Sequence, residues 1–287
     1  MLADAALPES SWYTVEDDEQ VDIATAEGNR LSVVMSMNGN GAMERLWGRV
    51  LDPDTLAAWA PALTAPIIEE SSKGLCATLI LVLCASVYHR ISHALLLGMF
   101  VGFGFDISED LSYATSSAIY SLDSDLAGAG VNLVGRIITA IPAHWAYTGL
   151  FTVGVLLLLP SFAGGDHWSR GRRLAVAAAL IFSAVFMHFI WNAPVPDSVL
   201  AKFAINLVVF FTAALLLIRD ERDLVRRRIS AGRSVEPLSA IEDDVLDSLG
   251  SWRDRRRFRR QARRDGGRKA KKAARQRQRA ALDLLNQ

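Results

Sequence analysis

Five long apolar segments occupy most of the chain between residues 67 and 218. Each reaches the roughly 20 residues that a helix needs to cross the hydrocarbon core of a bilayer. Because lipid leaves no partner for unpaired backbone groups, such segments cross membranes as helices. The pattern predicts an all-α fold, a polytopic transmembrane helix bundle of about five spans. The predicted spans are Ile67–Tyr88, Ile91–Tyr113, Val131–Pro160, Leu174–Ala193 and Val199–Ile218.

Charge is distributed unequally around this apolar block. Residues 1–60 carry eleven acidic and three basic side chains, and residues 219–287 carry 21 Lys and Arg against eleven acids. The asymmetry is typical of membrane proteins. It predicts three parts: an acidic, poorly ordered N-terminal segment over residues 1–55, a transmembrane core over 56–219, and a basic, soluble, partly helical tail over 220–287.

The basic residues also predict an orientation. A basic loop over Arg170–Arg173 and the basic tail after Arg219 flank the fourth and fifth segments at the same side. Lys and Arg gather on the cytoplasmic side of membranes. We therefore expect a multi-pass protein of the cell membrane with a cytoplasmic C-terminus. No apolar segment precedes Ile67, which fits either translocation of a short acidic N-terminal tail or a chain whose upstream helices are missing.

Two short stretches before the first span have local signals. Ser36–Gly41, with the sequence Ser-Met-Asn-Gly-Asn-Gly, predicts a turn. Thr64–Pro66 is typical of a helix start, because proline is tolerated near the first helical position.

Ionisable residues inside the apolar segments are the strongest functional signal, since each costs about 3 kcal/mol or more at bilayer depth. Glu69 and Glu70 are adjacent, and their mutual repulsion favours a proton on one of them near neutral pH. Lys73 follows four residues after Glu69 and can pair with it on one helix face. A glutamate poised in this way is a candidate general base. The alternative is an interfacial charge cluster that ends the helix.

A second cluster lies at similar depth on the next segment. Gly98 and Gly102 form a pair of small residues that permits close helix packing, and Phe105 continues this stretch. Glu109 and Asp110 follow in the outer part of the same segment. Their alternative interpretation is an ordinary outer helix end.

Further polar residues lie on the third and fourth segments. His144 lies near the middle of its segment, where a lone histidine often serves packing alone. His188 and Asn192 are four residues apart, so they share one helix face, and both can donate hydrogen bonds to a developing oxyanion. Together with the glutamates they supply a base, a water-positioning group and oxyanion donors, which are the parts that peptide hydrolysis needs.

The order of these motifs resembles the PrsW family of intramembrane proteases, which is distantly similar to the CAAX-prenyl and bacteriocin-processing proteases. The motifs are Glu-Glu-x-x-Lys, Gly-x-Gly-Phe-x-x-x-Glu, His-x-x-x-Thr-Gly and His-x-x-Trp-Asn, and they cover Pro66–Ala193. The resemblance implies an endopeptidase that uses glutamate-activated water to cleave a membrane-protein substrate, such as a single-span protein. Two departures are Asp110, where the family usually has Asn, and the missing upstream helices.

The resemblance also implies a role for each site residue. Glu69 would activate the water together with Glu70, and Glu109 would position it. His188 and Asn192 would form the oxyanion pocket, with His144 as a further site residue.

A metal is the less favoured expectation. The family is often called metalloprotease, and Glu109, His144 and His188 would be the ligands of a zinc ion. The chain has no HExxH motif, however, and related proteases work through glutamate without a tightly bound metal. The sequence thus requires no cofactor and leaves a divalent metal such as zinc as the alternative.

Two other functions compete with proteolysis. A non-enzymatic scaffold or sensor would use the basic tail, where Glu236–Leu249 predicts a short amphipathic helix. The strongly basic stretch Arg253–Leu285, with a break at Gly266 and Gly267, would bind anionic lipids, with nucleic acid as the less favoured partner. A proton-coupled transporter is the other alternative, because intramembrane Glu and His residues also form proton relays.

Overall fold

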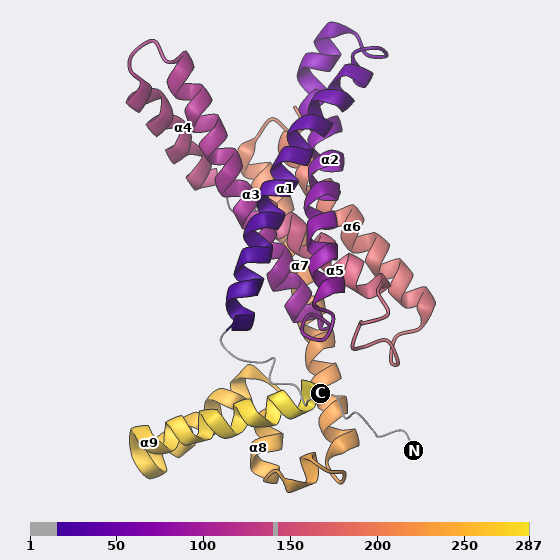
Figure 1. Cartoon of the computed structure of the whole chain (residues 1–287), viewed down its shortest axis with the longest axis vertical. Coiled ribbons are helices and arrows are strands. Elements are labelled where there is room, and N and C mark those ends of the chain that lie inside the picture. The colour runs from indigo at the N-terminus through magenta and orange to yellow at the C-terminus, as the bar shows by residue number, and fades with distance from the viewer. Residues whose placement is uncertain (1–15, 140–142, 287) are drawn as a thin grey trace, which may run out of the picture. The chain divides into compact units, whose positions relative to one another are not determined.

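The computed structural model describes residues 16–139 and 143–286, with side chains over residues 30–139 and 143–285. Every regular element in this part of the chain is a helix, and the chain divides into two compact units, residues 1–213 and 214–287 (Figure 1). Helix α7, Val199–Gly232, contributes residues to both units. The predicted all-α class is confirmed.

A helical membrane bundle is also confirmed, although the number of spans differs from five. Within the described residues, three helices are long and apolar enough to cross a membrane: α3 (Ile91–Tyr120), α6 (Arg170–Asn192) and α7. A fourth span results if α4 (Asp125–Thr139) and α5 (His144–Leu158) are counted as one, since they are bent by 46° at their break. The predicted span Val131–Pro160 had joined these two helices into one continuous segment.

The first predicted span belongs to a longer helix, α2, Pro53–Leu83. Asp52 caps this helix by accepting hydrogen bonds from the backbone N–H groups of Thr55 (3.0 Å) and Asp54 (3.1 Å). The hydrogen bonds, chiefly the one from Thr55, lower the pKa of the Asp52 carboxyl. Pro66, predicted near a helix start, lies inside α2. The charges in the middle of α2 explain why it does not qualify as a span by composition.

The segment before α2 is more ordered than predicted, because α1 extends over Glu16–Trp47; residues 1–15 lie outside the described residues. The predicted turn at Ser36–Gly41 lies inside this helix. A Cβ at Gly39 would lie only 2.5 Å from Cγ2 of Ile68 on α2. The small residues that suggested a turn therefore permit close packing of two helices.

Helix α5 lies at the centre of the first unit, against α2, α3 and α6 (Figure 1). A Cβ at Gly98 would lie 2.5 Å from the carbonyl oxygen of Thr148, and one at Gly102 would overlap the backbone of His144. The two glycines thus bring the backbones of α3 and α5 into contact, and this contact places His144 in the bundle.

The second unit has its own small apolar core. After α7 come a short 3-10 helix, Leu238–Ala240, then α8 (Asp243–Ser248) and α9 (Trp252–Asn286). Gly266 and Gly267, the pair at which the sequence suggested a break, have non-helical backbone angles inside α9. The buried core consists of Val225, Ile229, Leu238, Val245, Leu246, Leu249, Ala281 and Leu285.

Candidate functional site

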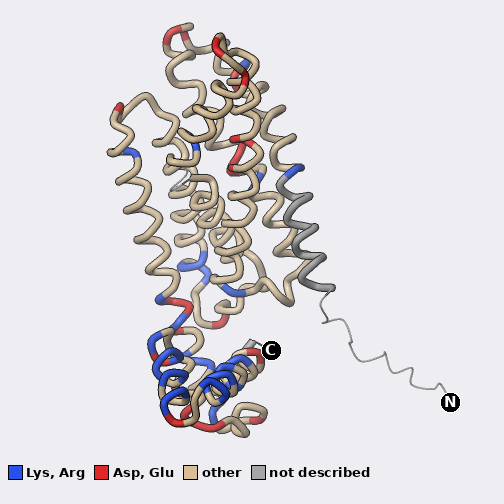
Figure 2. Tube along the Cα trace, turned by 90° about the vertical axis from the view of Figure 1, so that its left-hand side faces the viewer, with Lys and Arg blue, Asp and Glu red and all other residues tan. Residues whose placement is uncertain are grey.

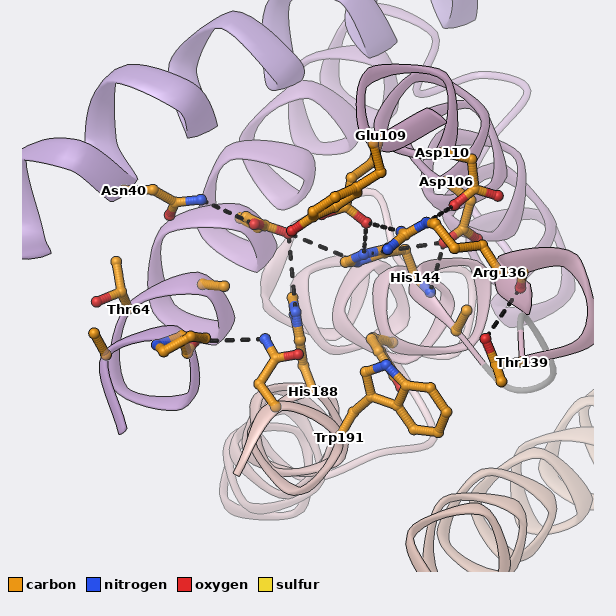
Figure 3. A pocket seen from close by; sticks show the side chains of 18 of the residues that line it. Asn40, Thr64, Asp106, Glu109, Asp110, Arg136, Thr139, His144, His188 and Trp191 are labelled. Carbon is orange, nitrogen blue, oxygen red and sulfur yellow. Dashed lines mark hydrogen bonds and ion pairs between the residues drawn. The ribbon is translucent and has the colours of Figure 1, made fainter. Parts of the chain in front are cut away.

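A cavity of about 380 Å³ lies in the first unit and is lined by side chains from α1 to α6 (Figure 3). The predicted residues Glu69, Glu109, His144, His188 and Asn192 all line it. Glu70 and Lys73 are fully buried beside it and bond to its histidines. The structure therefore brings together polar residues that are up to 123 positions apart in the sequence.

Glu70 is the most heavily bonded carboxylate of this site. Its Oε1 lies 2.6 Å from Nζ of Lys73 and 2.9 Å from Nδ1 of His188, and its Oε2 accepts a hydrogen bond of 3.0 Å from the Thr148 hydroxyl. These contacts join α2 to α5 and α6. A carboxylate whose two oxygens are both engaged is suited to orienting its neighbours rather than to accepting a proton from water.

Glu69 differs from Glu70 because only one of its two carboxylate oxygens accepts a hydrogen bond from a described residue. Its Oε1 accepts a hydrogen bond of 2.9 Å from the side-chain amide of Asn40 on α1. Its Oε2 is buried and has no hydrogen-bond partner among the residues that the structure describes. That oxygen lies 3.9 Å from Nδ1 of His144, Nε2 of His188 and Nζ of Lys73. Glu69 thus presents an unsatisfied acceptor at the cavity wall.

His188 is oriented on two sides. An ionised Glu70 can only accept a hydrogen bond, so Nδ1 of His188 carries the hydrogen and Nε2 presents its lone pair toward Glu69. The Tyr147 ring stacks on the imidazole at 5.3 Å between centroids, and the hydroxyl of Tyr147 accepts a hydrogen bond of 3.1 Å from Asn206. The imidazole is therefore fixed with its free nitrogen at the cavity.

Asn192 lies one helical turn after His188 on the same face of α6, as the spacing predicted. Its amide nitrogen is 3.5 Å from the carbonyl oxygen of Pro61, which is long for a hydrogen bond. The amide is thus held near the cavity by a weak contact that a better acceptor can replace.

His144 is held between two charges of opposite sign. Nζ of Lys73 lies 2.5 Å from its Nδ1, and Oε2 of Glu109 lies 3.3 Å from its Nε2. Because an ammonium only donates, Nδ1 accepts and Nε2 carries the hydrogen. Asp106 on α3 accepts hydrogen bonds from the backbone N–H groups of His144 (3.3 Å) and Trp145 (3.4 Å), which fixes the start of α5.

Arg136 on α4 is a site residue that the sequence interpretation missed. It forms ion pairs with Glu109 and Asp110 (Figure 3). Its guanidinium lies 4.3 Å from the centroid of the Tyr113 ring. A single arginine within an otherwise apolar segment was the signal that could have identified it. Glu109, for which the resemblance implied a role in positioning water, lies between Arg136 and His144.

Phe105, assigned by the sequence to helix packing, covers the charged centre of the site. Its ring lies 4.9 Å from the His144 ring, measured between centroids, and Nζ of Lys73 lies 4.3 Å from its centroid. The ring shields the contact between Lys73 and His144 and gives the ammonium a cation–π partner.

The donor set also fits a divalent metal. Ligand atoms of Glu69, His144 and His188 all lie within 4.8 Å of one another, and two imidazoles with one carboxylate form a known catalytic zinc set. The unsatisfied Oε2 of Glu69 supports this fit. The sequence had placed Glu109 in this group, but that carboxylate is bound by Arg136. Nδ1 of His144, the ring nitrogen that lies 3.9 Å from Oε2 of Glu69, is in contact with the ammonium of Lys73.

Comparison with known proteins gives one result. Searches of curated proteins and of solved structures find no match. A family model described as PrsW family intramembrane metalloprotease matches residues 23–218, from α1 into α7. That range contains every residue of the cavity. The family is one of intramembrane peptide hydrolases, which agrees with the membrane helices and with the buried polar site. The chain belongs to the PrsW family of intramembrane metalloproteases.

Proposed function

We propose that this chain cleaves a membrane-protein substrate with a water molecule activated by Glu69. The observation that carries the proposal is the buried Oε2 of Glu69, which has no hydrogen-bond partner among the described residues and lies 3.9 Å from Nε2 of His188. A water between these two acceptors can give a hydrogen bond to each. Glu70, by contrast, has both oxygens engaged and acts by orienting His188 and Lys73.

The reaction follows from these positions. Glu69 takes a proton from the water while the water oxygen attacks the carbonyl carbon of the scissile peptide bond. The carbonyl oxygen becomes an oxyanion in a tetrahedral intermediate. Glu69 then returns the proton to the amide nitrogen of the leaving chain, and the carbon–nitrogen bond breaks. The products are a carboxyl group and a free amine.

The oxyanion needs hydrogen-bond donors, and Asn192 is the first of them. Its amide can exchange the long contact with Pro61 for a bond to the oxyanion. His188 does not donate to the oxyanion in this arrangement, because its Nδ1 hydrogen is directed to Glu70 and its Nε2 carries a lone pair. His188 therefore accepts a hydrogen bond from the attacking water at Nε2, which orients that water beside Glu69.

Glu69, His144 and His188 are the residues that would hold a metal ion. Such an ion would acidify a bound water and polarise the substrate carbonyl. The ammonium of Lys73 would then have to leave Nδ1 of His144 and would retain Glu70 as its partner.

We further propose that the substrate is a membrane protein of one span and that the C-terminus of this chain faces the cytoplasm. The cavity is lined in part by α3 and α6, which have the length and composition of membrane spans, so a substrate segment can reach it from the bilayer. The basic tail after Arg219 supports the orientation. A cytoplasm-type reporter fused after Gln287 should be active, and activity of a periplasm-type reporter alone would contradict the orientation.

The test of the function is reconstitution with the solubilised membrane proteins of the host in vesicles. New N-termini, mapped by mass spectrometry, should appear with the wild type and be absent with His188→Ala. Proton flux across the vesicle wall, measured in the same sample with a pH-sensitive dye, should not depend on the protein. Protein-dependent proton flux without new N-termini would contradict the protease function and support a transporter.

A further inference from the structure

The strongest feature outside the protease site is a basic cleft on the second unit. A cavity of about 600 Å³ lies on α9 and is lined by eight cationic side chains and one tryptophan. We call this set the α9 cleft. Its lining residues are Trp252, Arg256, Arg259, Arg260, Arg263, Arg268, Lys271, Lys272 and Arg275.

The cleft is formed by the two arms of α9, residues 252–265 and 268–286. Gly267 has a φ of 71°, a backbone angle that favours glycine, and the helix changes direction there. The side-chain amide of Gln278 on the second arm donates to the hydroxyl of Ser248 (2.7 Å) and to the carbonyl oxygen of Arg255 (3.4 Å) on the first arm. Ala274 is fully buried. The two arms are therefore packed on each other, and the cleft has a defined shape.

A solvated basic helix would scatter its charges or pair them with acids. Arg226, Arg233 and Arg277 of this unit form salt bridges with carboxylates, and none of the three lines the α9 cleft. The eight cations of the cleft have no ion pair with a carboxylate in the part of the chain that the structure describes. Figure 2 shows the basic residues crowded along these helices. Such a concentration of unneutralised charge creates a positive potential that attracts anionic groups.

We propose that the α9 cleft binds the phosphate head groups of anionic phospholipids. Cations in such number match the charge of clustered phosphates, and basic clusters that follow a membrane helix are typical sites for acidic lipids. Trp252 is 56% exposed at the cleft, with the guanidinium of Arg256 at 5.0 Å from its ring, and tryptophan favours the head-group region.

The connection of the chain favours lipid over a soluble polyanion. Helix α7 runs without interruption from an apolar span into the second unit. The cleft is thereby tethered to a membrane, and its effective concentration toward head groups is high. The proposal is independent of the protease mechanism, because every residue of the cleft lies outside the cavity that contains Glu69.

The experiment uses the full chain in neutral detergent micelles. Native mass spectrometry follows the binding of phosphatidylglycerol and of phosphatidylcholine with identical acyl chains. The wild type should bind phosphatidylglycerol at least about tenfold more tightly, and this preference should fall as salt rises. Arg263→Gln with Lys272→Gln, which removes two charges from the cleft, should weaken phosphatidylglycerol binding about tenfold or more.

A matched variant separates the cleft from general charge. Lys269→Gln with Arg279→Gln also removes two exposed cations of α9, but neither residue lines the cleft. The affinity of this variant for phosphatidylglycerol should stay within about twofold of that of the wild type. Circular dichroism verifies that both variants keep their helices, and Arg263→Lys should retain binding.

Three results would overturn the proposal. The first is an equal loss in the two charge-matched variants, which would show attraction without a site. The second is equal affinity for the two lipids. The third is displacement of phosphatidylglycerol by a single-stranded oligonucleotide at low micromolar concentration, seen with the wild type and not with the cleft variant. That result would assign the cleft to nucleic acid.

Discussion

Oε1 of Glu70 on α2 lies 2.9 Å from Nδ1 of His188 on α6, and this contact determines which nitrogen of the imidazole faces the cavity. The same oxygen also holds the ammonium of Lys73 at 2.6 Å. Glu70 therefore connects the positive charge of the site to its free imidazole. Its neighbour Glu69 keeps one oxygen without a hydrogen-bond partner among the described residues. We therefore propose different tasks for the two adjacent carboxylates, orientation for Glu70 and chemistry for Glu69.

The first prediction concerns Glu70→Gln. The substitution leaves the buried ammonium of Lys73 without its close charge partner, which should lower the free energy of unfolding by about 3 kcal/mol. Thermal unfolding in detergent measures the change. Glu44→Gln removes a charge from an exposed residue of the same cavity and should leave the unfolding temperature unchanged. Equal unfolding temperatures for Glu70→Gln and the wild type would contradict the assigned role of Glu70.

A second prediction concerns Arg136, which pairs with Glu109 and Asp110 at the cavity. Arg136→Gln leaves two adjacent carboxylates beside His144 without their counter-charge. We expect a loss of about 10- to 100-fold in the cleavage rate, as for other residues that position a catalytic group. Arg136→Lys keeps the charge but cannot bind both carboxylates with a planar guanidinium, so its cleavage rate should lie between those of the wild type and Arg136→Gln. A wild-type rate in Arg136→Gln would show that the ion pairs have no part in catalysis.

Close contact between α3 and α5 gives a third prediction. A Cβ at Gly102 would overlap the backbone of His144, so Gly102→Ala should push the helices apart and destabilise the protein by about 1–3 kcal/mol. The cleavage rate of Gly102→Ala should fall as well, because the substitution displaces His144. Gly135→Ala on α4 meets nothing within 4 Å and serves as the control. It should be neutral or stabilising. Equal effects of the two substitutions would exclude a role for helix contact.

Most residues singled out in the sequence meet at one cavity, whereas several helix bounds differ from the predicted segments. Glu69, Glu70, His144 and His188 were recognisable because a polar group in an apolar segment needs a partner or a function. Helical spacing then placed His188 and Asn192 on one face, where the structure has them. These inferences use only the cost of burial and the period of a helix.

Other features depend on tertiary packing and were not accessible in this way. The glycines and asparagines of α1 suggested a turn, yet Gly39 makes room for Ile68 and Asn40 donates to Glu69. Local propensity cannot distinguish a turn from a close helix crossing. The break between α4 and α5 was hidden for the same reason, since hydropathy averages over it. Arg136 acquires its role only because that break brings α4 to the cavity.

A fourth prediction concerns metal binding. Lys73 and a divalent ion share Nδ1 of His144, so they should exclude each other. Lys73→Met should therefore bind zinc at least about tenfold more tightly than the wild type, because repulsion by the ammonium is lost. Competition with a chromophoric chelator measures the affinity, and His144→Ala in the same background should abolish the gain. Identical zinc affinities for the wild type and Lys73→Met would contradict the competition.

The most direct test of the account compares rate and stability in Glu69→Gln. Glutamine keeps an oxygen that can accept the hydrogen bond from Asn40, so the unfolding temperature should match that of the wild type. The amide cannot take a proton from water, so single-turnover cleavage in vesicles should fall by about 10²–10⁴-fold. This combination is the predicted result. Cleavage at the wild-type rate by a correctly folded Glu69→Gln protein would contradict the assignment of Glu69 as the base.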